Sequence, residues 1–192
     1  MFAITIDQRR SRERPDGVPE LLTAVNGFPL VREFERTAGD EAQGLADDPG
    51  VAVDVVLTAA RSGDWWVGLG VGEVESPVPR SVRESRGPAL IRARAAVERA
   101  HRSSSGVAVE GEDAVHAETA LQIVAGIVQE RSPEGHQAVA AMQRSSSQKE
   151  AAERLGISAQ AMSSRLQVAR WVDEARMREL AAYLLAEAAA QA

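Results

Sequence analysis

The spacing of apolar residues along positions 1–111 switches repeatedly between the short continuous runs of strands and the three- to four-residue intervals of helices. Strands are predicted at short apolar, β-branched runs and on either side of a hairpin turn at Gly39-Asp40-Glu41, and helices where apolar residues recur on one face. The predicted elements are strands at 2–6, 34–37, 43–45, 65–75 and 105–111, and helices at 18–28, 50–63 and 87–100. This order predicts a mixed sheet with helices packed on it.

The rest of the chain carries only helical patterns. From Asp113 onward no strand candidate remains, and breaks at 132–133 and 144–147 separate successive helices. We therefore predict an α+β protein with an α/β domain over residues 1–111 and an all-α domain over residues 112–192. The last predicted helix, over 174–192, is rich in alanine and leucine, and either dimerises or docks on the first domain.

Residues 147–170 carry the most specific pattern in the chain, that of a helix-turn-helix. Ser147 and Glu150 have the spacing of a capping box, Gly156 tolerates the positive φ of a tight turn, and Ser158 caps the next helix. Met162 recurs with other apolar residues at helical spacing on the inward face of the second helix. The alternative is a helix pair that only packs.

The outward side chains of this segment predict contacts with DNA. Glutamine pairs with adenine edges in the major groove, and arginine and lysine reach phosphates. Residues 144–170 hold five basic and two acidic residues, a net charge of +3, although the whole chain carries −6. The predicted DNA-binding residues are Lys149, Ser158, Gln160, Ser163, Ser164, Arg165, Gln167 and Arg170.

Composition excludes several classes of protein. The chain has no cysteine, so disulfides and thiolate metal sites are impossible. No apolar run approaches the roughly 20 residues that cross a membrane, and the first seven residues reach a charge before an apolar region develops. These features favour a cytoplasmic protein without a membrane partner. His101, His116 and His136 lack metal-ligand spacing and are expected to be scattered surface histidines.

The first 110 residues resemble class III nucleotidyl cyclases. The resemblance rests on Ile6-Asp7, Gly39-Asp40 and the glycine-containing strand over residues 67–75. Those enzymes have a ferredoxin-like, palm-type sheet, in which one metal-binding aspartate ends the first strand and another lies in a Gly-Asp hairpin. The resemblance therefore implies a Mg²⁺ site at Asp7 and Asp40, joined by Glu41, with a bound nucleotide.

Basic residues near this corner suggest how phosphates would be held. Arg9, Arg10 and Arg12 follow Asp7 directly and would clamp phosphates, or else form a solvated loop. Arg94 occupies the place of the cyclases' transition-state arginine, but Leu90 falls where they carry an asparagine. Since leucine donates no hydrogen bond, nucleotide binding is favoured over cyclisation.

Two further resemblances concern the C-terminal part and the whole chain. Gly156-Ile157-Ser158 and Ser164-Arg165-Leu166 are similar in spacing to the helix-turn-helix of sigma-factor region 4. Nearly the full chain resembles the SatD-type family of bacterial proteins, on residues 4–12, 39–43 and 68–72. Members of that family look like DNA-binding regulators.

Two main functional hypotheses follow, beside a third in which the domains only bind other proteins. The first is a DNA-binding transcriptional regulator, a homodimer because helix-turn-helix proteins usually bind two half-sites, with a degenerate cyclase-like domain for nucleotide sensing or assembly. The second is a Mg²⁺-dependent nucleotidyl cyclase or phosphoryl-transfer enzyme with a regulatory helical tail.

Overall fold

A computed structural model describes residues 1–192 as five strands and eight α-helices. The strands are β1 (Phe2–Gln8), β2 (Arg32–Ala38), β3 (Glu41–Ala46), β4 (Trp65–Val71) and β5 (Val107–Glu110). The helices are α1 (Val18–Val25), α2 (Pro49–Ala60), α3 (Pro88–Ala100), α4 (Val115–Gln129), α5 (Pro133–Gln143), α6 (Gln148–Leu155), α7 (Ala159–Val168) and α8 (Trp171–Ala190). A single 3₁₀ turn, η1 (Val82–Glu84), precedes α3. No helix is long and apolar enough to cross a membrane.

The strands form one mixed sheet in the order β2-β3-β1-β4-β5, which confirms the predicted α+β class. Three neighbouring pairs are antiparallel, and α3 connects β4 to the parallel strand β5. The predicted strand at 65–75 ends at Val71, four residues early. Val71 pairs with Phe2, the first residue of β1, so the partner strand ends at this point.

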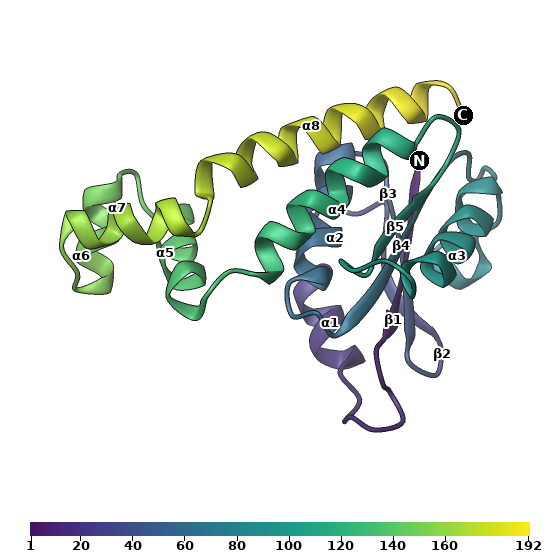
Figure 1. Ribbon diagram of the computed structural model, residues 1–192. Helices are drawn as coiled ribbons and strands as arrows, with labels where there is room; N and C mark the ends of the chain where they lie inside the picture. Colours follow the sequence, from purple (N-terminus) through teal and green to yellow (C-terminus); the bar gives the residue numbers. More distant parts are fainter.

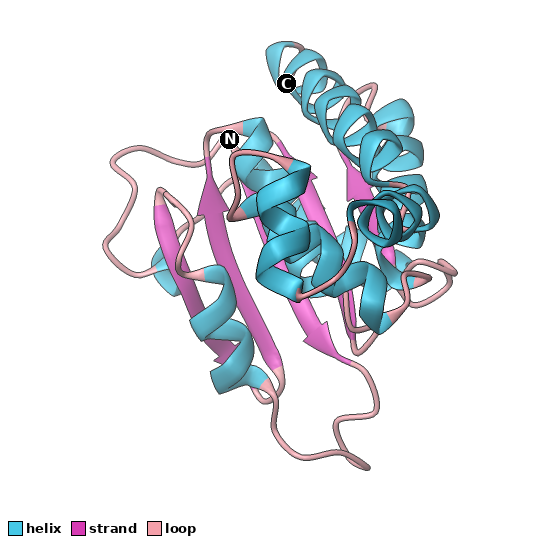
Figure 2. Cartoon of the chain, turned by 90° about the vertical axis from the view of Figure 1, so that its left-hand side faces the viewer, coloured by secondary structure: helices cyan, strands magenta, loops and turns pink.

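Helices cover the two faces of the sheet unequally. Alternate residues of β1, such as Ile4 and Ile6, enter a 31-residue core with side chains of α1, α2, α4 and α8. Ala3, which lies between Phe2 and Ile4 in β1, instead packs in a cluster with Ala89 and Ala93 of α3 on the opposite face. In Figure 1, α3 is the only α-helix on its side of the sheet. Figure 2, which views the sheet from the side opposite α3, shows other helices lying across the strands.

Two glycines on β4 allow α3 to pack directly on the strand backbone. A Cβ at Gly70 would lie 2.0 Å from the Ala89 carbonyl oxygen, and one at Gly68 would lie 2.1 Å from the Val97 amide nitrogen. Both contacts are with backbone atoms, which cannot rotate away. Glycine is therefore required at Gly68 and Gly70 for this close packing of α3.

The packing divides the chain differently from the predicted boundary at 111/112. Residues of α4 and α8, including Leu121 and Leu185, belong to the same core as the sheet. Only α5, α6 and α7 stand apart, around a separate core of eight buried residues. We call these three helices the distal unit. The sheet and its covering helices, including α4 and α8, we call the body. The distal unit projects from one side of the body, at the N-terminal end of α8 (Figure 1).

The packing of α3 predicts opposite effects of alanine at two glycines. Gly70→Ala places a methyl group against fixed backbone and should destabilise the protein by about 3 kcal/mol. Gly126→Ala, in α4 with nothing within 4 Å of the added Cβ, should stabilise it by up to about 1 kcal/mol. Denaturant unfolding of both variants measures this difference. Equal stability of Gly70→Ala and wild type would contradict the close approach of α3.

Candidate functional site

Helices α6 and α7 are joined through specific caps. The hydroxyl of Ser147 accepts the Glu150 amide at 3.2 Å, and the Ser158 hydroxyl accepts the Ala161 amide at 3.1 Å. Gly156 lies between the helices with φ +64°, in the left-handed region that glycine adopts without strain. The Glu150 carboxylate accepts the amide of Ser146 rather than that of Ser147. Together with Arg154 this bond lowers the pKa of Glu150 to about 2.

A small apolar core fixes the angle between these two helices. Ala151 and Ala152 of α6 pack with Met162 and Leu166 of α7, and α5 closes the third side of this core. The small alanines permit close approach, and the fully buried Met162 fills the space between the helices. The distal unit is therefore held as one body by its own core.

The outward face of α7 carries small, neutral polar side chains. Gln160, Ser163, Ser164 and Gln167 are exposed, and no acidic residue lies anywhere in α7. At about 100° per residue, Gln160, Ser164 and Gln167 point directly away from the buried Met162. Such a face offers hydrogen-bond donors and acceptors without charge repulsion toward a polyanion.

The four other predicted DNA-binding residues have different environments. Lys149 is exposed and makes no ion pair, whereas Arg170 is paired with Asp173 at 3.1 Å. Ser158 is exposed, but its hydroxyl caps α7. Arg165 is half-buried beside α5. There the pKa of Glu134 is lowered mainly by hydrogen bonds from its own amide and Ser132, with a smaller contribution from Arg165.

A second group of predicted residues lies where β1 meets the β2–β3 hairpin. Asp7 pairs in register with Glu41, and the Gln8 amide donates to the Asp40 carbonyl oxygen. Burial raises the pKa of Asp7, and the charge of Asp40 raises it further. His101 opposes this shift from 3.6 Å away. The structure thus brings the predicted carboxylates close together on the face that α3 partly covers.

The carboxylates predicted to hold Mg²⁺ are partly engaged within the protein. The Glu41 carboxylate is occupied by Arg94 and by the Thr37 hydroxyl. No three His, Asp or Glu side chains are grouped so that they could hold a metal ion. Mg²⁺ binding therefore stays a prediction of the resemblance.

The arginines predicted to clamp a nucleotide are not gathered at one place. Arg9 donates to the Trp65 carbonyl oxygen at 3.1 Å, and its guanidinium lies 5.0 Å from the Trp66 ring centroid. Arg10 and Arg12 are exposed on the loop after β1. Of the four predicted arginines, only Arg94 contacts a predicted carboxylate. Arg9 is instead a packing residue, which the sequence pattern did not indicate.

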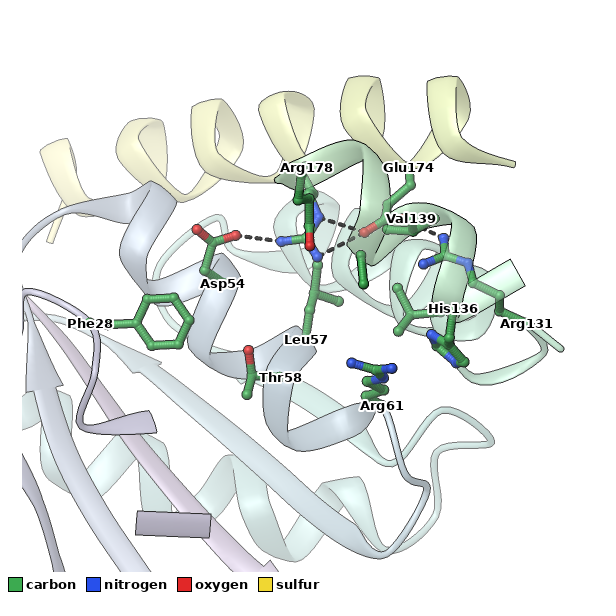
Figure 3. Close-up of a pocket in the computed structure, with 13 residues that line it drawn as sticks. Phe28, Asp54, Leu57, Thr58, Arg61, Arg131, His136, Val139, Glu174 and Arg178 are labelled. Carbon is green, nitrogen blue, oxygen red and sulfur yellow. Dashed lines mark hydrogen bonds and ion pairs between the residues drawn. The ribbon is translucent and has the colours of Figure 1, made fainter. Parts of the chain in front are cut away.

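A buried ion pair joins the distal unit to the body. The side chains of Arg131 and Glu174 are each only 3% exposed, and Arg131 also donates to the Ala169 carbonyl oxygen at 3.0 Å. Glu174 accepts a second bond from Arg178 at 2.8 Å, and Arg178 reaches Asp54 on α2. This network, shown in Figure 3, connects α2, the α4–α5 junction, the end of α7 and α8.

Beside this network lies a cavity of about 320 Å³. Its walls come from α2 and from the α1–β2 connection of the body, from α5 of the distal unit, and from α8. Thirteen residues line it, among them Arg61 and His136, which face it in Figure 3. Sequence reasoning placed His136 on the open surface and did not single out Arg131 or Glu174. Their importance comes from tertiary packing, which leaves no local pattern.

No known protein family, curated protein or solved structure matches the chain. Inferences about its function therefore rest on its own residues.

The buried pair predicts an asymmetric response to substitution. Arg131→Ala removes one of the two arginine partners of the buried Glu174 carboxylate and should cost about 3 kcal/mol of stability. Replacing both residues, as Arg131→Met with Glu174→Leu, should recover most of that loss. Arg14→Ala, which breaks an exposed pair with Asp64, should cost less than about 1 kcal/mol. Urea unfolding tests all three, and an Arg131→Ala loss no larger than that of Arg14→Ala would contradict the burial of the pair.

The raised pKa of Asp7 predicts how stability depends on pH. Because the folded protein disfavours the charged carboxylate, stability falls as pH rises from the ordinary aspartate value through the raised one, and the loss persists at pH 7. Asp7→Asn should therefore melt at a higher temperature than wild type at pH 7, with the difference shrinking toward pH 4.

The control for this experiment is Asp47→Asn, which changes an exposed carboxylate and should leave the melting temperature nearly unchanged. Parallel pH curves for wild type and Asp7→Asn would contradict the account. A rise in wild-type melting temperature on adding MgCl₂ that Asp7→Asn abolishes would instead support the Mg²⁺ prediction.

Proposed function

We propose that this protein is a DNA-binding transcriptional regulator whose α6 and α7 form a helix-turn-helix, with α7 in the major groove. The observation that carries the proposal is the outward face of α7, where Gln160, Ser164 and Gln167 are exposed on a helix without acidic residues. Small side chains permit close approach to base edges, and the two glutamines can form paired hydrogen bonds with adenine. A helix pair used only for packing requires no such face.

The distribution of charge and the shape of the molecule support the same function. The segment 144–170, which contains α6 and α7, carries +3 in a chain of −6, so positive charge is concentrated around these two helices. Figure 1 shows this unit projecting away from the sheet and its covering helices. A duplex could therefore contact α7 while the acidic body stays at a distance, which reduces electrostatic repulsion.

Phosphate contacts would come from residues that surround this face. Lys149 is exposed at the start of α6, and Gln148 beside it lines a shallow groove together with Ser163, Gln167 and Arg170. The pair between Arg170 and Asp173 is exposed on both sides, so exchanging the carboxylate for a phosphate costs little. In this proposal Lys149 and Arg170 set the register of α7, and the glutamines supply sequence preference.

For the body we propose a ferredoxin-like domain that senses a ligand or mediates assembly. The order β2-β3-β1-β4 with antiparallel neighbours supports that arrangement, and β5 extends it by one strand. Leu90 packs against a small apolar cluster with Ala89 and Ala93 rather than offering a donor. The pairing of Glu41 with Arg94 also favours a supporting role over catalysis.

We further propose that the regulator acts as a homodimer. Large apolar side chains are exposed on the outer helices of the body, notably Ile123 on α4 and Leu180 and Tyr183 on α8. A second copy covering them would place two distal units on one duplex, as half-site recognition requires.

Charge introduced on the outward face of α7 tests the proposed function. The double variant Gln160→Glu, Gln167→Glu should bind its selected duplex at least about tenfold more weakly, because two carboxylates would face phosphates and lose the adenine bonds. Lys149→Ala should reduce the salt dependence of binding by about one phosphate contact. Affinities are measured by fluorescence anisotropy with duplexes selected from a random library.

The matched control is Gln191→Glu, which makes the same change at the exposed C-terminal end of α8. It should bind like wild type. If the double variant and this control bind the selected duplex equally well, or if selection enriches no sequence, α7 is not the DNA-recognition helix.

A further inference from the structure

The cavity between the body and the distal unit has the size and composition of a ligand site. At about 320 Å³ it falls at the lower end of the range typical of small-molecule pockets. Phe28, Leu57 and Val139 supply apolar walls, and polar side chains converge on it from α2, α5 and α8. Figure 3 shows α2 on one side of this space and α5 on the other.

The charges around the cavity leave one arginine unpaired. Three arginines and two carboxylates line it. Arg178 contacts both Asp54 and Glu174, and Arg131 contacts Glu174, so every carboxylate already has a partner. Arg61, at the end of α2, makes no ion pair. The uncompensated positive charge of the cavity therefore lies at Arg61.

Several hydrogen-bonding groups of the lining are also unused. The side chains of Arg61, His136, Thr58 and Gln143 make no hydrogen bond within the protein, although all four line the cavity. In Figure 3 the guanidinium of Arg61 and the imidazole of His136 lie near each other, from opposite walls. Burial lowers the pKa of His136, and the positive charges of Arg61 and Arg131 lower it further, against the opposing effect of Glu174. The same positive field would attract an anion.

We propose that this cavity binds a small phosphorylated metabolite, with its phosphate between Arg61 and His136. A guanidinium donates two parallel hydrogen bonds to phosphate oxygens, and a neutral imidazole adds one N–H. Thr58 and Gln143 complete the polar shell, and the apolar walls contact the rest of the ligand. None of these residues belongs to the predicted nucleotide corner at Asp7, so this is a separate site.

The position of the site gives the ligand a regulatory role. Arg61 and Thr58 belong to the body, whereas His136 and Gln143 belong to the distal unit, so a bound phosphate bridges the two. The ligand thereby favours one orientation of α7 relative to the body, and in a dimer it sets the separation of the two recognition helices. This second step rests on the proposed DNA-binding function, and the first does not.

Ligand binding is tested by thermal unfolding of the full chain. The probes are inorganic phosphate, adenosine 5′-monophosphate and glucose 6-phosphate, with adenosine and glucose as uncharged counterparts. At least one phosphorylated probe should raise the Tm saturably, by about 5 °C at a hundredfold excess over its Kd. Arg61→Ala should abolish the rise, and Arg102→Ala, which removes another exposed arginine outside the cavity, should retain it.

Because Arg61 is exposed and unpaired, Arg61→Ala should fold like wild type. His136→Gln provides a second variant, on the opposite wall, and should weaken binding of the same probe. The site is refuted if no phosphorylated probe raises the Tm, if the uncharged counterpart raises it equally, or if Arg61→Ala keeps the full response.

The regulatory step is tested by DNA affinity with and without the active probe. A saturating probe should change the Kd for the selected duplex by about fivefold or more in wild type and leave Arg61→Ala unchanged. Stabilisation by the probe with an unchanged Kd would refute the regulatory step alone. Stabilisation of a protein that binds no duplex would refute the proposed function and leave the ligand site standing.

Discussion

The buried ion pair between Arg131 and Glu174 determines where the distal unit lies relative to the body. Both side chains are almost fully removed from water, so neither charge can lose its partner cheaply. Arg131 passes between α5 and the end of α7, where a Cβ on Gly135 would lie 2.8 Å from its Cγ. The pair therefore depends on a glycine in α5 and a carboxylate in α8. An orientation that separated them would expose or orphan two charges, which makes the observed arrangement specific.

Helix α8 belongs to the body but also contacts α7, so it holds the distal unit in its position. Its first residues pack with α7 and hold Glu174, and its later residues, such as Leu185, lie in the core beneath the sheet. The network continues through Arg178 to Asp54 on α2. The cavity at Arg61 and His136 lies beside this network. A ligand there would therefore contact the region that holds α7 in its position relative to the body. The proposed DNA-binding face and the proposed ligand site are thus connected through α8 and the same ion-pair network.

Local patterns were enough to predict most secondary-structure elements. Short apolar runs identified three strands, and the turn at Gly39-Asp40-Glu41 identified the other two. Serine and glycine at fixed offsets identified both ends of α6 and the start of α7, because caps and turns depend on neighbours in sequence. The sequence did not predict which part of the protein each apolar helix face packs against. The pattern of α4 indicated only a helix, and that of α8 left dimerisation and docking on the first domain both open, whereas in the structure both helices share the core of the sheet. The division at 111/112 therefore runs through a continuous core.

Site residues were harder to predict, for the same reason. Asp7, Asp40 and Glu41 do lie close together, as register pairing of neighbouring strands requires. The partner of each charge, however, is set by tertiary contacts. Arg9 lies on the Trp66 ring, Arg94 pairs with Glu41, and His136 lines a cavity that its place in the sequence does not indicate. The residue types indicated that metal or phosphate binding was possible. Tertiary packing determined which of these side chains are already paired within the protein and which are not.

Backbone amide chemical shifts recorded during titration with a selected DNA duplex would test the central claim most directly. The account predicts that the largest changes fall on the outward residues of α7 and the first turn of α6, with smaller changes where the distal unit meets α2 and α8. Changes concentrated on the arginine-rich loop after β1 or on the open face beside α3, with α7 unaffected, would contradict it.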